Sequence, residues 1–222
     1  MKVLLGITIL VVCVQLVTSM ALNRTKRYAE KPDISKINEL RRAVAGFMPK
    51  DISKKMTDLK WDEQLVAVAK DMSQKTNDCN QIKPFASFRP FFEGPDENGA
   101  KMVEAFYAVM LSPENMTEEQ KKEAVKLKSH WKSQVNEISL HRLELFNPPQ
   151  YKIGCAQSRC IGVIPSKLKA IMPGLTGDTY TFDIICVLGP TSTWSLPALQ
   201  DVEYAAGKAK VAKKKSLLGF SS

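Results

Sequence analysis

The 222-residue chain contains only two histidines, and its one long hydrophobic run lies at the extreme N-terminus. It carries no P-loop, no G-x-S-x-G elbow and no G-x-G-x-x-G turn, which are signatures of nucleotide hydrolases, serine esterases and dinucleotide-dependent enzymes. Scarce histidine also restricts acid–base and zinc chemistry near neutral pH. These absences leave few routes to catalysis.

The N-terminal run has the pattern of a secretory signal peptide. Lys2 supplies positive charge, residues 3–17 are almost wholly apolar, and Ser19 and Ala21 offer small residues for cleavage. A membrane anchor needs an apolar core of about 20 residues, and polar residues end this one earlier. We assign residues 1–21 to a signal peptide and find no later run long enough to span a bilayer. The sequence therefore predicts a secreted, extracellular protein.

The net charge of +9 is located at the two ends of the chain. Residues 1–27 carry four bases and residues 208–222 carry five, with no acid in either segment, whereas residues 28–207 hold 23 basic and 23 acidic side chains. A neutral body argues against a nucleic-acid groove. We expect residues 193–222 to form a basic tail, which from Gly207 is either a disordered, solvated arm or a contact for anionic surfaces.

Residues 22–32 form a linker or a short propeptide. The segment Arg24-Thr25-Lys26-Arg27 has the form that furin-like proteases cut, so processing after Arg27 and a plain basic linker are both open. Asn23 and Asn115 each begin an N-glycosylation sequon, and both count only if the chain is exported.

Export also decides the state of the cysteines. Cys13 leaves with the signal peptide, and Cys79, Cys155, Cys160 and Cys186 remain. Four cysteines in an oxidising compartment form two disulfides with three alternative pairings, and the spacing does not choose among them. Each disulfide would stabilise the fold by about 2–4 kcal/mol, and oxidised cysteines are excluded as nucleophiles.

Apolar periodicity predicts helices in the first half of the chain and strands in the second, which indicates a single α+β domain. Caps and turn residues mark the ends of several elements. The expected helices are 33–46, from 61 to before 79, 99–111 and 117–138, and the expected strands are 152–164 and 179–188.

Four stretches of the sequence resemble the CAP superfamily of cysteine-rich secretory, antigen-5 and pathogenesis-related proteins. Within it, the chain is most similar to the activation-associated secreted and venom-allergen-like proteins of nematodes. The four stretches are Ile37 to Arg42 (family H-N-x-x-R, with isoleucine for histidine), Met56 to Cys79 (M-x-x-L-x-W-D, then C), Lys152 to Cys160 (K-I-G-C-A, then C) and Ile185 to Pro190 (V-C-N-Y-x-P, without Asn-Tyr).

The resemblance covers nearly all of residues 33–192, which we therefore assign to the CAP domain. It implies a three-layer α-β-α sandwich with a central antiparallel sheet. It also suggests the disulfide pairs Cys79–Cys155 and Cys160–Cys186.

Family members often hold two histidines and two glutamates in a cleft, which in some of them binds zinc. Here residues 79–94 contain no histidine for the first position, and Glu97 lies in a segment similar to the family's G-E-N. Gln134 occupies the position of the second glutamate, and Glu137 would replace it only after a shift of the helix. His141 matches the last histidine by its distance from the K-I-G-C motif, but its neighbours differ from the family pattern.

One histidine and one glutamate make a poor zinc site, because zinc takes three or four protein ligands. His130 is expected to be exposed or half-buried on its helix rather than a ligand. We therefore expect a non-catalytic protein without a cofactor that binds an extracellular protein, or a lipid such as a sterol. The alternative is a divergent hydrolase or metal-binding protein that uses His141 with Glu97.

Overall fold

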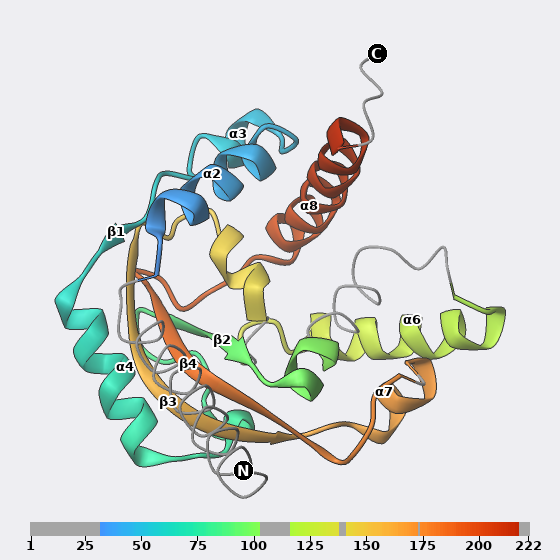
Figure 1. Ribbon diagram of the computed structural model, residues 1–222. Helices are drawn as coiled ribbons and strands as arrows, with labels where there is room; N and C mark the ends of the chain where they lie inside the picture. Colours follow the sequence, from blue (N-terminus) through green and yellow to red (C-terminus); the bar gives the residue numbers. More distant parts are fainter. Residues whose placement is uncertain (1–31, 103–115, 138–140, 173, 218–222) are drawn as a thin grey trace, which may run out of the picture. The chain divides into compact units, whose positions relative to one another are not determined.

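The computed structural model describes residues 32–102, 116–137, 141–172 and 174–217 (Figure 1). The side chains of His141 and of residues 210–217 lie outside this description. So do the expected signal peptide, the segment around Arg27, and both sequon asparagines, Asn23 and Asn115.

Helices and strands alternate in the described chain, and Figure 1 shows the sheet between helices. No helix of the described ranges has both the length and the apolarity to cross a bilayer. The elements are α2 (Ile34–Ala45), α3 (Lys50–Ser53), β1 (Lys60–Trp61), α4 (Glu63–Lys75), η1 (Cys79–Gln81), β2 (Arg89–Pro95), α6 (Glu118–Ser133), η3 (His141–Phe146), β3 (Lys152–Val163), α7 (Ser166–Ile171), β4 (Thr179–Gly189) and α8 (Leu196–Leu217).

Three of the four expected helices begin at polar caps. Asp33 accepts a hydrogen bond from Ser35 N at the start of α2, and Asp62 caps α4. The capping box of Thr117 and Gln120 at the start of α6 is fully formed. The other expected helix is present over residues 97–102, and its continuation falls outside the described residues.

The sheet has four strands in the order β1-β3-β4-β2. Strand β4 pairs antiparallel with β3 and with β2, a strand that the sequence did not predict, which agrees with the expected antiparallel sheet; β1, however, pairs parallel with β3. The sheet is therefore mixed and mostly antiparallel. Strand β1 runs in the same direction as β3, and the two strands share only two residue pairs.

Two hydrophobic clusters lie on opposite faces of the sheet, because consecutive residues of a strand point to opposite sides. The first cluster includes residues of α2, η3 and α8, and the second includes residues of α4, α6 and α7. Phe91, Cys155 and Cys186 belong to the first cluster. Their neighbours in the chain, Phe92, Ala156 and Ile185, belong to the second. Helices thus cover both faces, which gives the three layers.

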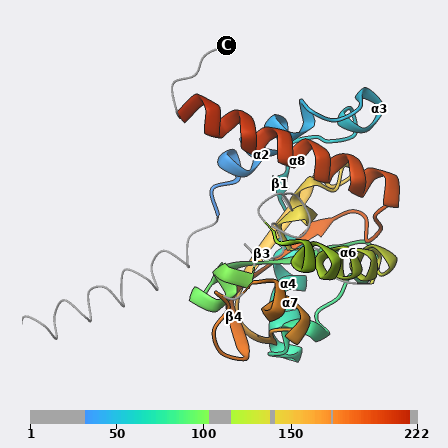
Figure 2. The same ribbon diagram turned by 90° about the vertical axis from the view of Figure 1, so that its right-hand side faces the viewer.

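Helix α8 corrects the expectation of a solvated arm beyond Gly207, because residues 196–217 are helical. Figure 2 shows this helix running across the top of the domain. Apolar residues about one turn apart place it in the first cluster, and they include Leu199, Val202 and Ala205, all fully buried. The core therefore continues past residue 192, where we expected the domain to end.

The K-I-G-C stretch lies where α4 starts against β3. A Cβ atom on Gly154 would lie 2.3 Å from Val66 N and 2.8 Å from Asp62 O, so only glycine allows the helix to approach this closely. Lys152 pairs with Asp62 at 2.8 Å, and this contact raises the lysine pKa and lowers the aspartate pKa. Glycine and lysine of the same strand therefore fix the start of α4.

We expect Gly154→Ala to destabilise the fold by about 3 kcal/mol, because the methyl group would meet backbone atoms that cannot rotate away. The matched control is Gly174→Ala, since a Cβ atom there has nothing within 4 Å. Urea unfolding of both variants checks the difference. Equal unfolding midpoints would show that the close approach of α4 to Gly154 does not contribute to the stability of the fold.

Candidate functional site

The candidate site lies where strand β2 contacts η3. Arg89 of β2 and Glu144 of η3 are both fully buried, and the Arg89 guanidinium donates to both carboxylate oxygens, through Nη2 to Oε1 at 2.8 Å and through Nε to Oε2. The guanidinium also donates to Ser192 O at 2.6 Å and to Val135 O at 2.9 Å. Arg89 thus joins four segments of the chain.

Trp194 closes the other side of this ion pair. Its indole Nε1 donates to Glu144 Oε2 at 2.8 Å, and its backbone N donates to Asn136 Oδ1 at 2.9 Å. Asn147 and Gln150 hold the residues just before it through the Thr193 and Thr191 carbonyls. The segment that leads from β4 into α8 is therefore fixed by polar side chains that follow α6 and η3.

A second carboxylate of β2, Glu93, lies at the edge of the same contact. Arg142 of η3 donates to its Oε2 at 2.9 Å, and the Glu93 side chain is 26% exposed. Burial raises the pKa of Glu93 above its ordinary value of 4.5, because the charged form loses hydration, while Arg142 opposes this rise. Glu93 is therefore the partly accessible acid at this contact.

The structure does not connect Glu97 with η3. Its side chain is 84% exposed and pairs with Lys101 at 2.9 Å, one helical turn further along. His141 is the first residue of η3, and its side chain lies outside the described structure. The acid that the fold brings to η3 is thus Glu93, which the sequence comparison did not select.

The remaining positions of the expected tetrad lie at the end of α6. Gln134 is the C-cap residue of this helix, and Glu137 is exposed in the turn that follows. His130 is exposed on α6. Across the described part of the chain, no three histidine, cysteine, aspartate or glutamate side chains are grouped so as to hold a metal ion.

Cys79, Cys155, Cys160 and Cys186 do form two disulfides, but the suggested pairing is wrong. The pairs are Cys79–Cys160 and Cys155–Cys186. Cys155 and Cys186 are direct cross-strand partners of β3 and β4 and belong to the first cluster, whereas Cys79 and Cys160 belong to the second. The sheet separates the two sets, so Cys79 cannot reach Cys155.

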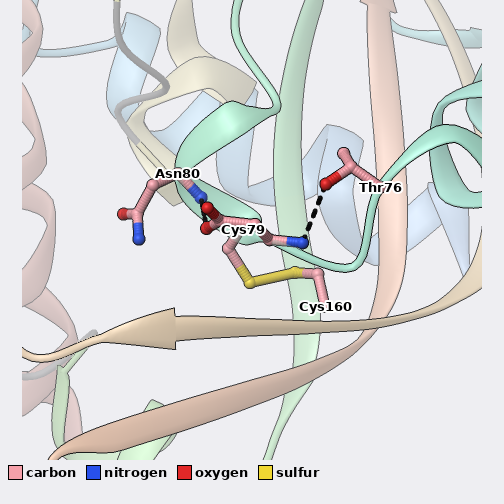
Figure 3. The surroundings of a disulfide bond; sticks show 5 residues. Thr76, Cys79, Asn80 and Cys160 are labelled. Atoms are coloured by element: carbon pink, nitrogen blue, oxygen red, sulfur yellow. Dashed lines mark hydrogen bonds between the residues drawn. A yellow bond between two sulfur atoms is a disulfide. The ribbon is translucent and has the colours of Figure 1, made fainter.

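A local contact brings η1 to the second half of β3. Ile161 N donates to Asn77 O at 2.6 Å, which places the following Cys79 beside Cys160. Figure 3 shows this disulfide with Thr76 and Asn80 at the turn, where Thr76 Oγ1 accepts from Asp78 N and Asp78 Oδ1 accepts from Asn80 N. The turn and the disulfide together hold η1 against the sheet.

A family model described as the cysteine-rich secretory protein family, CAP, matches residues 34–162. The chain belongs to this family. Searches against curated proteins and against solved structures found no match. Strand β4 and helix α8 lie beyond the matched residues, although they complete the sheet and the first cluster of this CAP domain.

In this CAP domain the motif residues of α2 form hydrogen bonds with backbone groups of other segments. Asn38 exchanges two hydrogen bonds with the Leu59 backbone, at 2.8 and 3.0 Å. Arg41 is buried and donates to the carbonyls of Thr57, Leu145 and Gln150. Burial lowers the pKa of Arg41 to about 10, which leaves it charged at neutral pH. These two side chains tie α2 to the segments that precede β1 and β3.

Removing one member of the buried ion pair is expected to cost about 3–5 kcal/mol, because its partner keeps an uncompensated charge. The double variant Arg89→Met/Glu144→Gln should lose about 3 kcal/mol less than the sum of the single variants. Urea unfolding gives the free energy of unfolding of the unsubstituted protein, the two single variants and the double variant. Arg42→Met, which breaks the exposed 2.6 Å pair with Asp58, is the control and should cost less than about 1 kcal/mol.

Glu93 should make the protein less stable as the pH rises above its ordinary pKa of 4.5. Below that pH the carboxyl is protonated in both states; above it the unfolded chain releases the proton first, so stability falls up to the raised pKa of the folded state. Glu93→Gln should remove this fall, and Arg142→Gln should extend it to higher pH. Carboxyl NMR titration and urea midpoints from pH 4 to 8 check both, with Glu97→Gln as the exposed control.

Proposed function

We propose that this CAP domain acts by binding an extracellular protein or a lipid, such as a sterol, and not by catalysis. The observation that carries the proposal is that both glutamates at the contact of β2 with η3 are bound to arginine. Glu144 is fully buried between Arg89 and Trp194, and Glu93 is held by Arg142. Arg89 occupies both oxygens of Glu144, and Arg142 opposes the rise in the pKa of Glu93 that burial causes, so both carboxylates are held in ion pairs.

A binding role also agrees with how the fold uses its polar side chains. Arg41, Arg89 and Glu144 are buried, and their hydrogen bonds hold backbone segments or each other. Such networks make a scaffold rigid, and a rigid scaffold presents the same surface to a partner without an ordering cost. The partner would therefore meet a preformed surface.

We place the protein outside the cell. The N-terminal sequence has the signal-peptide pattern, and two disulfides persist in oxidising compartments. We further propose glycosylation at Asn115 and Asn23, processing after Arg27, and a position near the nematode activation-associated secreted and venom-allergen-like proteins within the family.

A divergent hydrolase or metal-binding protein is the second candidate, and one observation favours it. Glu93 is partly buried, its pKa is raised, and it pairs with Arg142 of η3, the residue that follows His141. Raised carboxyl pKa values concentrate at functional sites. His141 and Glu93, instead of Glu97, would then be the acid–base pair.

Zinc titration separates the two candidates. We expect isothermal calorimetry of the purified protein to show no stoichiometric zinc binding, because one histidine and one arginine-bound glutamate fall short of the three or four ligands that zinc takes. Stoichiometric zinc that disappears in both His141→Ala and Glu93→Gln, with an esterase or protease rate lost in the same variants, would favour the hydrolase. Native mass spectrometry of the secreted protein tests directly for a retained lipid.

A further inference from the structure

Positive charge is concentrated on three helices of the domain. Helices α6, α7 and α8 together contain twelve lysines and five acids, whereas α2, α3 and α4 together contain six bases and four acids. One of those six bases, Arg41, is buried. The net charge of +9 is therefore not only a property of the chain ends, because α8 turns the C-terminal lysines into part of a folded helix.

The three helices lie next to one another. Lys128 and Lys132 of α6 reach Glu203 of α8 at 3.4 and 2.9 Å, and Gln120 of α6 donates to Ile171 O at the end of α7. Figure 2 shows α8, α6 and α7 one below the other on the side that faces the viewer. Glu203 is buried and neutralises lysines inside this contact, whereas Lys121, Lys126 and Lys169 pair with exposed or half-buried acids nearby.

Exposed lysines on all three helices remain available to a partner. Among the described residues, Lys122 of α6, Lys167 of α7 and Lys208 of α8 are exposed, and none of the three forms an ion pair. Helix α8 continues through a stretch whose sequence adds four lysines and no acid. We call the outward side of α6, α7 and α8 the basic face.

Apolar side chains are interspersed with these lysines. Val125 is 64% exposed and lies one helical turn after Lys121 and Lys122. Tyr204 is 62% exposed, and the Lys208 ammonium lies 5.4 Å from its ring centroid. A sulfated polysaccharide offers no apolar phase for an exposed valine, whereas at a lipid surface lysines meet headgroups and apolar or aromatic tips enter the interface.

We propose that the basic face docks on anionic lipid surfaces, with Lys122, Lys167 and Lys208 at the phosphate and carboxylate headgroups and Val125 and Tyr204 in the interface. Each lysine near such a surface strengthens binding about fivefold, and salt screens the attraction. The docking does not depend on the contact of β2 with η3. It can therefore fail while the proposed binding function stands, and the reverse also holds.

The test is flotation of the purified protein with two kinds of vesicle. We expect binding to phosphatidylcholine vesicles that contain about 30% phosphatidylserine, weak binding to pure phosphatidylcholine, and loss of binding as sodium chloride rises from about 0.1 to about 0.5 M. The triple variant Lys122→Gln/Lys167→Gln/Lys208→Gln should bind the anionic vesicles about 100-fold more weakly. Val125→Ser should weaken vesicle binding and leave retention on a heparin column unchanged, and Val125→Ser/Tyr204→Ser should weaken vesicle binding further.

The matched control removes three exposed lysines from other parts of the domain, Lys54→Gln/Lys70→Gln/Lys83→Gln, with the same change in net charge. It should retain binding to within about threefold, because only the basic face lies against the headgroups. Equal losses in the two triple variants would overturn the proposal in favour of unspecific attraction. Heparin retention without vesicle binding would overturn it in favour of a polysaccharide partner.

Discussion

The buried ion pair of Arg89 and Glu144 is the interaction on which the arrangement around the candidate site depends. A charged pair without exposure to water is favourable only when its remaining donors and acceptors are also bonded. Here the carbonyls of Val135 and Ser192 and the indole of Trp194 complete the set. The end of α6, the position of η3 and the approach to α8 therefore follow from the requirements of one guanidinium. The same requirements remove Glu144 from chemistry, since its oxygens already accept three hydrogen bonds.

The division of the core by the sheet is the second constraint, and it decides the disulfides. Each cysteine pair lies within one hydrophobic cluster, so the pairing follows from which face of the sheet a residue occupies and not from its order in the chain. Cys155 and Cys186 join strands that are already neighbours, whereas Cys79 and Cys160 attach η1, which has no ladder of its own. The Cys79–Cys160 disulfide therefore contributes more than Cys155–Cys186 to fixing a loop.

Sequence patterns predicted the elements with strong periodicity or caps, namely α2, α4, α6, β3 and β4, together with the α+β class. They did not predict β2, because Pro90 and Pro95 read as turn residues; an edge strand tolerates both. Helix α8 was missed for a similar reason, since Pro197, Gly207 and dense lysine obscure the buried stripe through Leu199 and Val202. The candidate site was only partly predictable, because Arg89, Glu93 and Glu144 meet through pairings between distant segments that no local spacing records.

The motif residues that reveal the family explain why membership predicts the fold better than the chemistry. Asn38 and Arg41 bind backbone carbonyls, Asp62 caps α4, and Gly154 lets that helix approach β3. Each of these roles depends on a short polar side chain, a planar guanidinium or the lack of a Cβ atom, so substitution is costly wherever the fold is kept. Glu93 and Arg142, by contrast, form a partly exposed ion pair that holds no backbone segment in place, so the fold constrains these two residues less. The match over residues 34–162 therefore reports the residues that hold the scaffold together, and it does not by itself specify the chemistry of the site.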